Sequence, residues 1–300
     1  MVRPALAAGR AVAVLDHFAA HPEQSYSLSE LSEALDVNLA SLLSVLQALV
    51  DAGYLVRHPR RKTYGLGMSL VAVGHAALTR HRVVDRARAE LRALAAESGI
   101  ACVVSTVAGD SIVVLAVEGR AAGRPPEVWA GQRLPLLPPL GQVFLAWSGA
   151  GSGEIRRWLD RTAAGVVLPE HLDAAMAAVR GRGWSANRDT PARTALGEAL
   201  ARLSDRPRDS QLRSRVAELV ASLGEDYELL AVEPGERYRL ATLSAPVFDQ
   251  HGTVALALTA TGLPELTGER LVGLAEQLGA VAGVLGEEIG GGRPPVGTAG

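Results

Sequence analysis

Lysine and cysteine are nearly absent from this chain: Lys62 is its only lysine, and Cys102 is its only cysteine. A single cysteine excludes an internal disulfide framework and a cysteine-rich metal site, which suits a reducing cytoplasm. The 7 histidines show no metal-ligand spacing. We therefore expect a cytoplasmic protein with no metal and no other cofactor.

Long hydrophobic runs and an excess of one charge are missing as well. No segment reaches the roughly 18 uncharged apolar residues that cross a bilayer, and the N-terminus lacks the apolar core of an export signal. The chain has 30 Lys and Arg against 32 Asp and Glu, for a net charge of -2. Binding to nucleic acid therefore has to come from a local basic patch.

The sequence also lacks the motifs of common enzymes. The glycine-rich stretch 149–153 has neither the lysine nor the hydroxyl of a phosphate-binding loop, and no Gly-x-Ser-x-Gly motif occurs. We expect no catalytic activity. With 300 residues and 48% hydrophobic side chains, the chain is long enough for two domains, each with its own core.

The N-terminal segment predicts three helices. Apolar residues recur at helical spacing over 5–20, then over 28–35, and again from Asn38 to Gly53. Ser27 and Glu30 have the spacing of a capping box at the start of the second helix. The short interruption at 36–38 gives the pattern helix, tight turn, helix.

After Gly53 the pattern changes from helical to extended. Residues 54–56 and 63–66 are short strand candidates, and the segment between them is rich in basic side chains. A hairpin after a helix-turn-helix predicts a winged helix, in which the second helix of the motif enters the major groove and the hairpin tip lies beside the phosphates. The tip residues predicted to contact DNA are Arg57, His58, Arg60, Arg61 and Lys62.

The remainder of the chain mixes strands and helices. The predicted strands are 100–107, 111–117, 128–130, 228–232, 238–248 and 253–261. The predicted helices are 67–78, 82–97, 142–147, 153–162, 169–180, a charged pair within 195–223, and 266–286. The tail 290–300 has too few apolar residues to order itself.

These features together resemble the IclR family of bacterial transcriptional regulators, over nearly all of residues 11–289. The motifs that carry the resemblance are DAGYL (51–55), YGLG (64–67), GQRLPL (131–136), GQVFLA (141–146), GWS (183–185) and APVFDQHG (245–252). The resemblance implies a C-terminal effector-binding domain of GAF-like α/β form, homo-oligomers, and control of transcription by a small ligand. The fold class expected is therefore α+β, a winged helix-turn-helix followed by a GAF-like domain with a mainly antiparallel sheet.

Three departures indicate a divergent branch of that family. The recognition helix begins ASLLS (40–44), where the family usually has Ser-Thr followed by Arg. Gly141-Gln142 replaces a common Gly-Lys pair, and the segment between GWS and APVF is unusually long. Without a long basic side chain on the recognition helix, bidentate reading of guanine by arginine is not available there.

Two sets of binding residues are predicted. On the N-terminal side, DNA contacts are assigned to Ser27, Asn38, Ser41, Ser44 and Gln47 in addition to the hairpin tip. The predicted effector site consists of Ser105, Thr106, Trp129, Leu134, Leu136, Leu137 and Gln142. Ordinary alternatives stay open: a solvated tip, a merely polar helix face, and core packing for the effector set. Cys102 is expected to be a small buried hydrophobe.

The predicted organisation is a winged helix at 1–66, a linker helix at 67–80, an effector-binding domain at 81–289 and a disordered tail at 290–300. The expected partners are double-stranded DNA, a small-molecule effector and further copies of the chain, as a homodimer or dimer of dimers, with no membrane. The alternative function is a winged-helix module that binds another protein and has no sequence-specific DNA binding.

Overall fold

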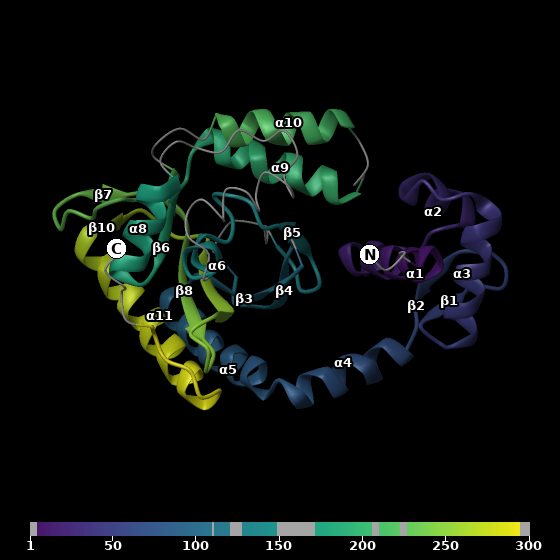
Figure 1. Cartoon of the computed structure of the whole chain (residues 1–300), viewed down its shortest axis with the longest axis horizontal. Helices are drawn as coiled ribbons and strands as arrows, with labels where there is room; N and C mark the ends of the chain where they lie inside the picture. Colours follow the sequence, from purple (N-terminus) through teal and green to yellow (C-terminus); the bar gives the residue numbers. More distant parts are fainter. Residues whose placement is uncertain are drawn as a thin grey trace.

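The computed structural model describes residues 5–109, 111–120, 128–148, 172–205, 210–222 and 227–294 (Figure 1). Its N-terminal part contains three helices and a two-stranded hairpin. Their bounds are α1 (Leu6–Ala20), α2 (Leu28–Leu35), α3 (Leu39–Asp51), β1 (Leu55–Arg57) and β2 (Tyr64–Leu66). The predicted winged helix-turn-helix is confirmed.

Local capping defines the turn between α2 and α3. Ser27 accepts a hydrogen bond from the N–H of Glu30, and the Glu30 carboxylate accepts from the N–H of Ser27, which completes the predicted capping box. Asp36 ends α2 in the left-handed region, with φ 50°, and α2 and α3 meet at 113°. This bend lets Phe18, Leu31 and Leu46 pack into one core without solvent exposure.

The described helices include none that is, singly, long and apolar enough to cross a bilayer. Taken together, α2 and α3 are long and apolar enough, but the pair is bent by 113°.

The wing is anchored to α3 by a close backbone approach. Leu55 pairs with Leu66 and Arg57 with Tyr64 in an antiparallel hairpin. Where β2 ends, the N–H of Gly67 donates to the carbonyl of Tyr54 over 2.8 Å. A Cβ at Gly67 would lie 2.2 Å from the carbonyl oxygen of Gly53. Only glycine fits at this position, so the sequence places it where the wing meets α3.

Two helices lead from the wing into the C-terminal part. These are α4 (Ser69–Arg80) and α5 (Arg82–Ser98), separated at His81. None of the residues of α4 is buried, and Figure 1 shows it crossing between the two parts with no other element alongside. The other helix, α5, packs against the sheet, and its Arg88 and Arg92 hold the buried Glu118 at 2.9 and 3.0 Å.

The C-terminal part is built on a six-stranded sheet in the order β5-β4-β3-β9-β8-β6, with every neighbouring pair antiparallel. Its strands are β3 (Ala101–Ala108), β4 (Ser111–Glu118), β5 (Arg133–Pro135), β6 (Ser185–Arg188), β8 (Leu240–Phe248) and β9 (Val254–Thr261). A separate small pair is formed by β7 (Arg237–Tyr238) and β10 (Leu266–Thr267). The expected α+β class with a mainly antiparallel sheet is confirmed.

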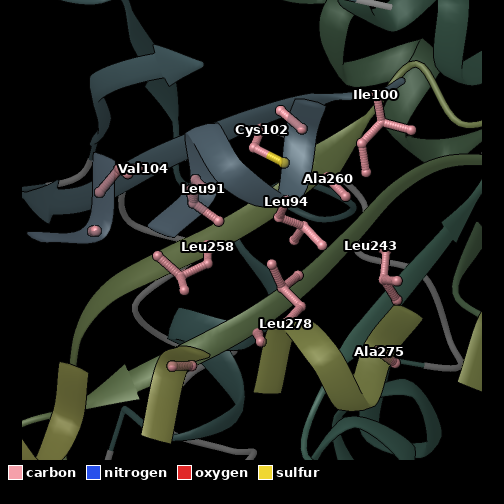
Figure 2. Packing of buried hydrophobic residues seen from close by; sticks show 14 of the residues in the cluster. Leu91, Leu94, Ile100, Cys102, Val104, Leu243, Leu258, Ala260, Ala275 and Leu278 are labelled. Atoms are coloured by element: carbon pink, nitrogen blue, oxygen red, sulfur yellow. The ribbon is translucent and has the colours of Figure 1, made fainter. Parts of the chain in front are cut away.

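One face of the sheet carries the larger core. Along each central strand, alternate residues such as Val104, Leu243 and Leu258 point to this face. They pack on α5 and on α11 (Gly268–Glu288), as Figure 2 shows around Leu91 and Leu278. Cys102 lies in this core without solvent exposure, and burial raises the pKa of its thiol to about 12. It therefore acts as a small hydrophobe, as the sequence predicts.

The opposite face is covered by the remaining helices, α6 (Gln142–Ala146), α8 (Leu172–Arg182), α9 (Pro191–Asp205) and α10 (Ser210–Ala221). Their apolar side chains form a second core with Phe248 and Ala257 of the sheet. In Figure 1, α9 and α10 lie side by side above this region. The helices do not fill this face completely, and a cavity remains on it.

Several predicted elements differ from the structure. Residues 128–130 form no strand, because the chain turns there and the N–H of Gln132 donates to the carbonyl of Trp129; β5 follows at 133–135. The predicted strand at 228–232 is reduced to a single bridge between Glu228 and Asn187. The predicted helix 153–162 and the glycine-rich stretch 149–153 lie outside the described residues. Beyond α11, Arg293 donates to the carbonyls of Arg180 and Gly181.

The contact at Gly67 yields a stability test. Gly67→Ala forces a Cβ into the Gly53 carbonyl, so we expect it to lower the unfolding free energy by about 2–4 kcal/mol. Gly279→Ala is the matched control: Gly279 lies within α11 with no atom within 4 Å of an added Cβ, and alanine there should stabilise by about 0.5–1 kcal/mol. Urea unfolding followed by circular dichroism measures both. Equal stability of Gly67→Ala and wild type would contradict the close approach.

Candidate nucleic-acid interface and ligand pocket

The exposed face of α3 carries short or medium-length uncharged side chains over its first three turns. Leu39 and Leu43 are 51% and 45% exposed, and Ser44 and Gln47 are exposed beside them. Ser44 donates to the carbonyl of Ala40 over 3.2 Å, and the Gln47 amide donates to Asp51 over 2.7 Å. Such a face can approach base edges closely, but it offers no cation to them.

Ser27, Asn38 and Ser41, which are also predicted to contact DNA, lie at the starts of α2 and α3. Ser27 caps α2, and Asn38 caps α3 by accepting from the N–H of Ser41 over 2.9 Å. The side chain of Ser41 is half-buried at the first turn of α3. These side chains lie at the N-termini of the two helices, where backbone N–H groups attract phosphate oxygens.

The wing tip carries the positive charge of this part of the chain. Arg57, His58, Arg60, Arg61 and Lys62 are all exposed. Within the part of the chain that the structure describes, none of them forms an ion pair with a carboxylate. The His58 Nδ1 accepts from the N–H groups of Arg60 and Arg61 at 3.3 and 3.1 Å. The imidazole therefore shapes the turn. The guanidinium of Arg57 lies over the Tyr64 ring, with 5.7 Å between its carbon and the ring centroid, and the side chains of Arg60, Arg61 and Lys62 are exposed.

A cavity of about 110 Å³ lies on the sheet face opposite the larger core. One side of it is polar and comes from three adjacent strands. The polar residues are Ser185 and Asn187 of β6, Thr242 and Ser244 of β8, and Thr259 and Thr261 of β9. The other side is apolar and includes Ile112, Val114, Leu134, Leu140, Val143 and Phe144. Arg193 of α9 also lines the cavity.

The predicted effector residues divide into two groups. Ser105, Leu134 and Gln142 line this cavity. Thr106 points away, because its hydroxyl donates to the carbonyl of Ala255 over 2.8 Å. Leu136 and Leu137 are buried in the helix-covered core, and Trp129 is half-buried beside the cavity-lining Val128 without lining the cavity itself. These four residues lie outside the lining of this cavity.

Gln142 is the most constrained polar residue of the lining. It is 2% exposed, and its Nε2 donates to the hydroxyl of Tyr227 over 2.8 Å. Its Oε1 is buried and has no hydrogen-bond partner. A buried acceptor without a partner is destabilising, so this oxygen carries an energetic cost in the described structure.

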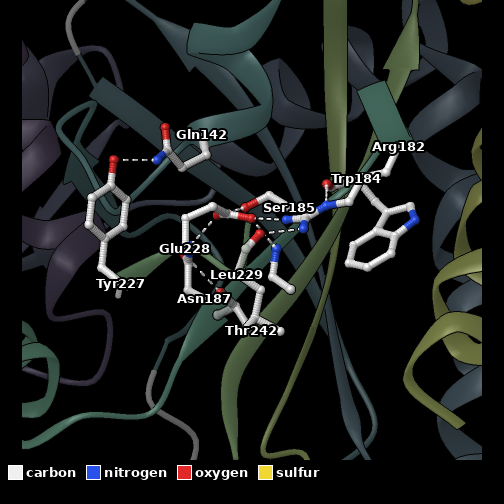
Figure 3. Close-up of polar contacts among 10 residues, drawn as sticks. Gln142, Arg182, Trp184, Ser185, Asn187, Tyr227, Glu228, Leu229 and Thr242 are labelled. Atoms are coloured by element: carbon white, nitrogen blue, oxygen red, sulfur yellow. Dashed lines mark hydrogen bonds and ion pairs between the residues drawn. The ribbon is translucent and has the colours of Figure 1, made fainter. Parts of the chain in front are cut away.

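The polar side of the cavity rests on a buried carboxylate, Glu228. This residue is 1% exposed and accepts from Ser185 Oγ and Asn187 Nδ2, both at 2.6 Å, and from the N–H of Ala186 at 2.7 Å. Arg182 donates to the same carboxylate and stacks on Trp184, with 4.2 Å between its guanidinium carbon and the ring centroid. Figure 3 shows these groups converging on Glu228. Every partner is a donor, which is the arrangement an ionised carboxylate needs.

Most of this polar surface was not predicted from the sequence. Ser185, Asn187, Thr242, Ser244, Thr259 and Thr261 were not among the predicted site residues. A signal was available, because small polar residues alternate with apolar ones along 242–245 and 258–261. In a sheet covered on both faces, this alternation identifies the face that is not filled by core.

The titration of Glu228 gives a pH test. Burial raises the pKa of Glu228 to about 7, and Arg182 only partly offsets it. The folded state binds the Glu228 proton more tightly than the unfolded state does. The bound proton therefore stabilises the fold fully below pH 4.5, the ordinary pKa of a glutamate, and this stabilisation is lost as the pH rises through about 7. The loss in unfolding free energy is on the order of 3 kcal/mol.

Glu228→Gln removes this titration. Urea unfolding of both proteins between pH 4.5 and 8 should show their difference in unfolding free energy changing across this window, with wild type losing more stability as the pH rises. A difference that does not vary with pH would show that Glu228 does not titrate there.

Comparisons with known proteins agree with these features. The sequence profile of the IclR helix-turn-helix domain matches residues 7–59, and that of the bacterial transcriptional regulator IclR C-terminal matches residues 75–192. No curated protein sequence matches the chain.

Three solved structures illustrate the likeness of fold. An IclR transcriptional regulator from Alicyclobacillus acidocaldarius is similar at 20% identity and TM-score 0.65, over 95% of this chain and 99% of that one. Pseudomonas aeruginosa HmgR is similar at 22% identity and TM-score 0.59, over 95% and 97%. An IclR homolog from Microbacterium hydrocarbonoxydans, complexed with 4-hydroxybenzoate, is similar at 15% identity and TM-score 0.62, over 94% and 99%. With both family domains in order and this fold, the chain belongs to the IclR family of transcriptional regulators.

Proposed function

We propose that this regulator binds double-stranded DNA through α3 and the wing, and that a small effector in the cavity of the C-terminal part changes its affinity for an operator. The observation that carries the proposal is the wing tip, whose basic side chains are exposed, lack carboxylate partners among the described residues, and lie next to α3. Phosphate contacts of this kind supply affinity and position the helix in the groove. The protein would act in the cytoplasm.

The residue ranges assigned to these roles are 1–66 for DNA binding, 67–80 for the linker and 81–289 for effector binding.

A direct contact between the DNA-binding part and the effector-binding part supports a coupling between them. Arg133 of β5 lies 3.6 Å from Asp16 of α1, and the next residue, Leu134, lines the cavity. A ligand that moves this edge of the cavity therefore acts on α1. The two parts can then have two relative arrangements with different affinities for DNA. The free energy by which the ligand changes DNA affinity cannot exceed the difference in its own binding free energy between those arrangements.

The apolar lining and the small volume favour an organic ligand. The relative complexed with 4-hydroxybenzoate shares the fold, which supports placing a small effector in this cavity. The described residues contain no group of three His, Cys, Asp or Glu side chains able to hold a metal ion, and no catalytic role is proposed.

The wing charges provide the main test. The triple variant Arg60→Ala, Arg61→Ala, Lys62→Ala should bind the DNA upstream of its own gene more weakly. The slope of log affinity against log salt should fall by about three units, one for each lost phosphate contact. A gel shift or fluorescence anisotropy over a range of salt measures this.

The control removes the same charge elsewhere. Arg215, Arg237 and Arg270 are exposed on α10, β7 and α11, and their triple alanine variant should keep the wild-type slope. If neither variant changes binding, or no salt-dependent shift is seen, the alternative is favoured, namely a winged helix that binds a protein partner.

We also propose that α4 mediates a homodimer. An isolated helix of fewer than about 12–15 residues is marginal in water, and α4 has 12 residues and no buried side chain. Val71 is 61% exposed on it. A second copy packed along α4 would cover these side chains and set two recognition helices about 34 Å apart.

The dimer proposal is tested by placing a charge on α4. Val71→Glu should shift the protein toward monomer in analytical ultracentrifugation, because the carboxylate would be buried in the contact. Val284→Glu, on the 52% exposed Val284 of α11, is the matched control and should leave the association state unchanged. An unchanged sedimentation coefficient for Val71→Glu would place the contact elsewhere.

A further inference from the structure

We propose that the recognition helix α3 selects thymine in the operator, and that Leu43 does so by contact with the C5-methyl group of the base in the major groove. This inference rests on the proposed DNA-binding function of the N-terminal part. It concerns which base that part prefers, and it follows from the kinds of side chain that α3 presents outside its core.

The first observation is a pair of exposed leucines on α3. Leu39 is 51% exposed and Leu43 is 45% exposed. They lie four residues apart, and therefore on adjacent turns along one side of the helix. A single exposed leucine is ordinary on a protein surface, but two neighbours on one helix form an apolar patch that points to a binding role.

The second observation is the position of this pair in the helix-turn-helix. In motifs of this type, the N-terminal residues of the second helix contact base edges in the major groove. Leu39 is the first residue of α3, and Leu43 lies on its second turn. Within residues 39–44, the exposed side chains are those of Leu39, Ala40, Leu43 and Ser44. The part of α3 that meets the bases is therefore mainly apolar.

The chemistry of the major groove then identifies the base. Hydrogen-bond donors and acceptors distinguish guanine, adenine and cytosine there, whereas only thymine carries a methyl group. No side chain within residues 39–44 is charged. Farther along the helix, the Gln47 amide already donates to Asp51 over 2.7 Å. An aliphatic side chain has no hydrogen bond to offer, so the methyl group of thymine is the feature that Leu43 recognises.

The surroundings of the leucine pair favour DNA as its occupant over a protein or a second copy of the chain. The wing lies next to α3 and carries the exposed Arg60, Arg61 and Lys62 (Figure 1). The starts of α2 and α3 present backbone N–H groups, which attract anions. These positive groups complement the phosphates that border a major groove, and the uncharged leucines between them complement the methyl groups inside it. An apolar partner would leave the positive groups without a counterpart.

The test replaces thymine with uracil, which lacks only the methyl group. The DNA upstream of the protein's own gene is prepared in two forms, one with thymine and one with uracil throughout. Burial of one methyl group changes affinity by about fourfold. Fluorescence anisotropy with the full-length protein should therefore show that the uracil form binds more weakly by about this factor or more. Equal binding of both forms overturns the inference.

Variants of Leu43 connect this preference to the leucine. Leu43→Ala shortens the side chain and should bind the two forms nearly equally, whereas Leu43→Met keeps a long apolar chain and should retain the preference. Leu230→Ala is the matched control, because Leu230 is 51% exposed in the C-terminal part, and it should behave as wild type. Circular dichroism checks that all three variants fold. A thymine preference undiminished in Leu43→Ala would come from DNA shape and would overturn the assignment.

Failure here is separable from failure of the proposed function. If neither form of the DNA shows salt-dependent binding, the DNA-binding function fails and this inference fails with it. If both forms bind equally and the salt dependence of the wing remains, only the selection of thymine is refuted. If Leu43→Ala lowers the sedimentation coefficient and leaves DNA binding unchanged, the leucines belong to a contact between copies of the chain, and the inference is wrong.

Discussion

The alternation of side chains along the strands is the constraint on which the C-terminal part of this protein depends. Because successive residues of a strand point to opposite faces, β3, β8 and β9 can bury Cys102, Leu243 and Leu258 against α5 and α11 and still present polar groups on the other face. The face against α5 and α11 supplies hydrophobic stabilisation. The opposite face carries hydroxyl groups around the cavity, whereas a fully apolar face would be covered by core side chains.

Glu228 organises that second face. An ionised carboxylate buried without partners would be strongly unfavourable, so its four donors are a condition of its being there. The same donors fix the directions of Ser185 and Asn187, and through Asn187 that of Thr242. One buried carboxylate is therefore hydrogen-bonded to two residues that line the cavity, Ser185 and Asn187.

The N-terminal part combines a small hydrophobic core with a basic hairpin. Its core is compact, and most of its positive charge lies on a hairpin that Gly67 holds against α3. The recognition helix itself has no basic side chain. Affinity for DNA would come mainly from the wing, and sequence reading from short contacts of α3 and from DNA shape. The exposed α4 joins this part to the sheet, and the Asp16–Arg133 pair provides a second, direct contact.

Local chemistry made much of the fold readable from the sequence. The capping box at Ser27, the helical spacing in α1 to α3, the basic hairpin and the apolar strands all depend on residues within a few positions of one another, and all were predicted. Three of the seven predicted effector residues, Ser105, Leu134 and Gln142, also line the cavity. The misplaced strands at 128–130 and 228–232 are short segments whose turn or bridge is set by distant contacts.

The sequence by itself determined the kinds of elements, their order and the place of the positive charge, because those follow from periodicity and from neighbours along the chain. Only the tertiary structure decided which polar residues share the cavity and which acid is buried beneath it. Glu228 and its partners are 41 to 46 residues apart, and nothing in the local sequence distinguishes this glutamate from an exposed one. Burial and hydrogen-bond direction arise when distant strands pair, so they become visible only in the folded chain.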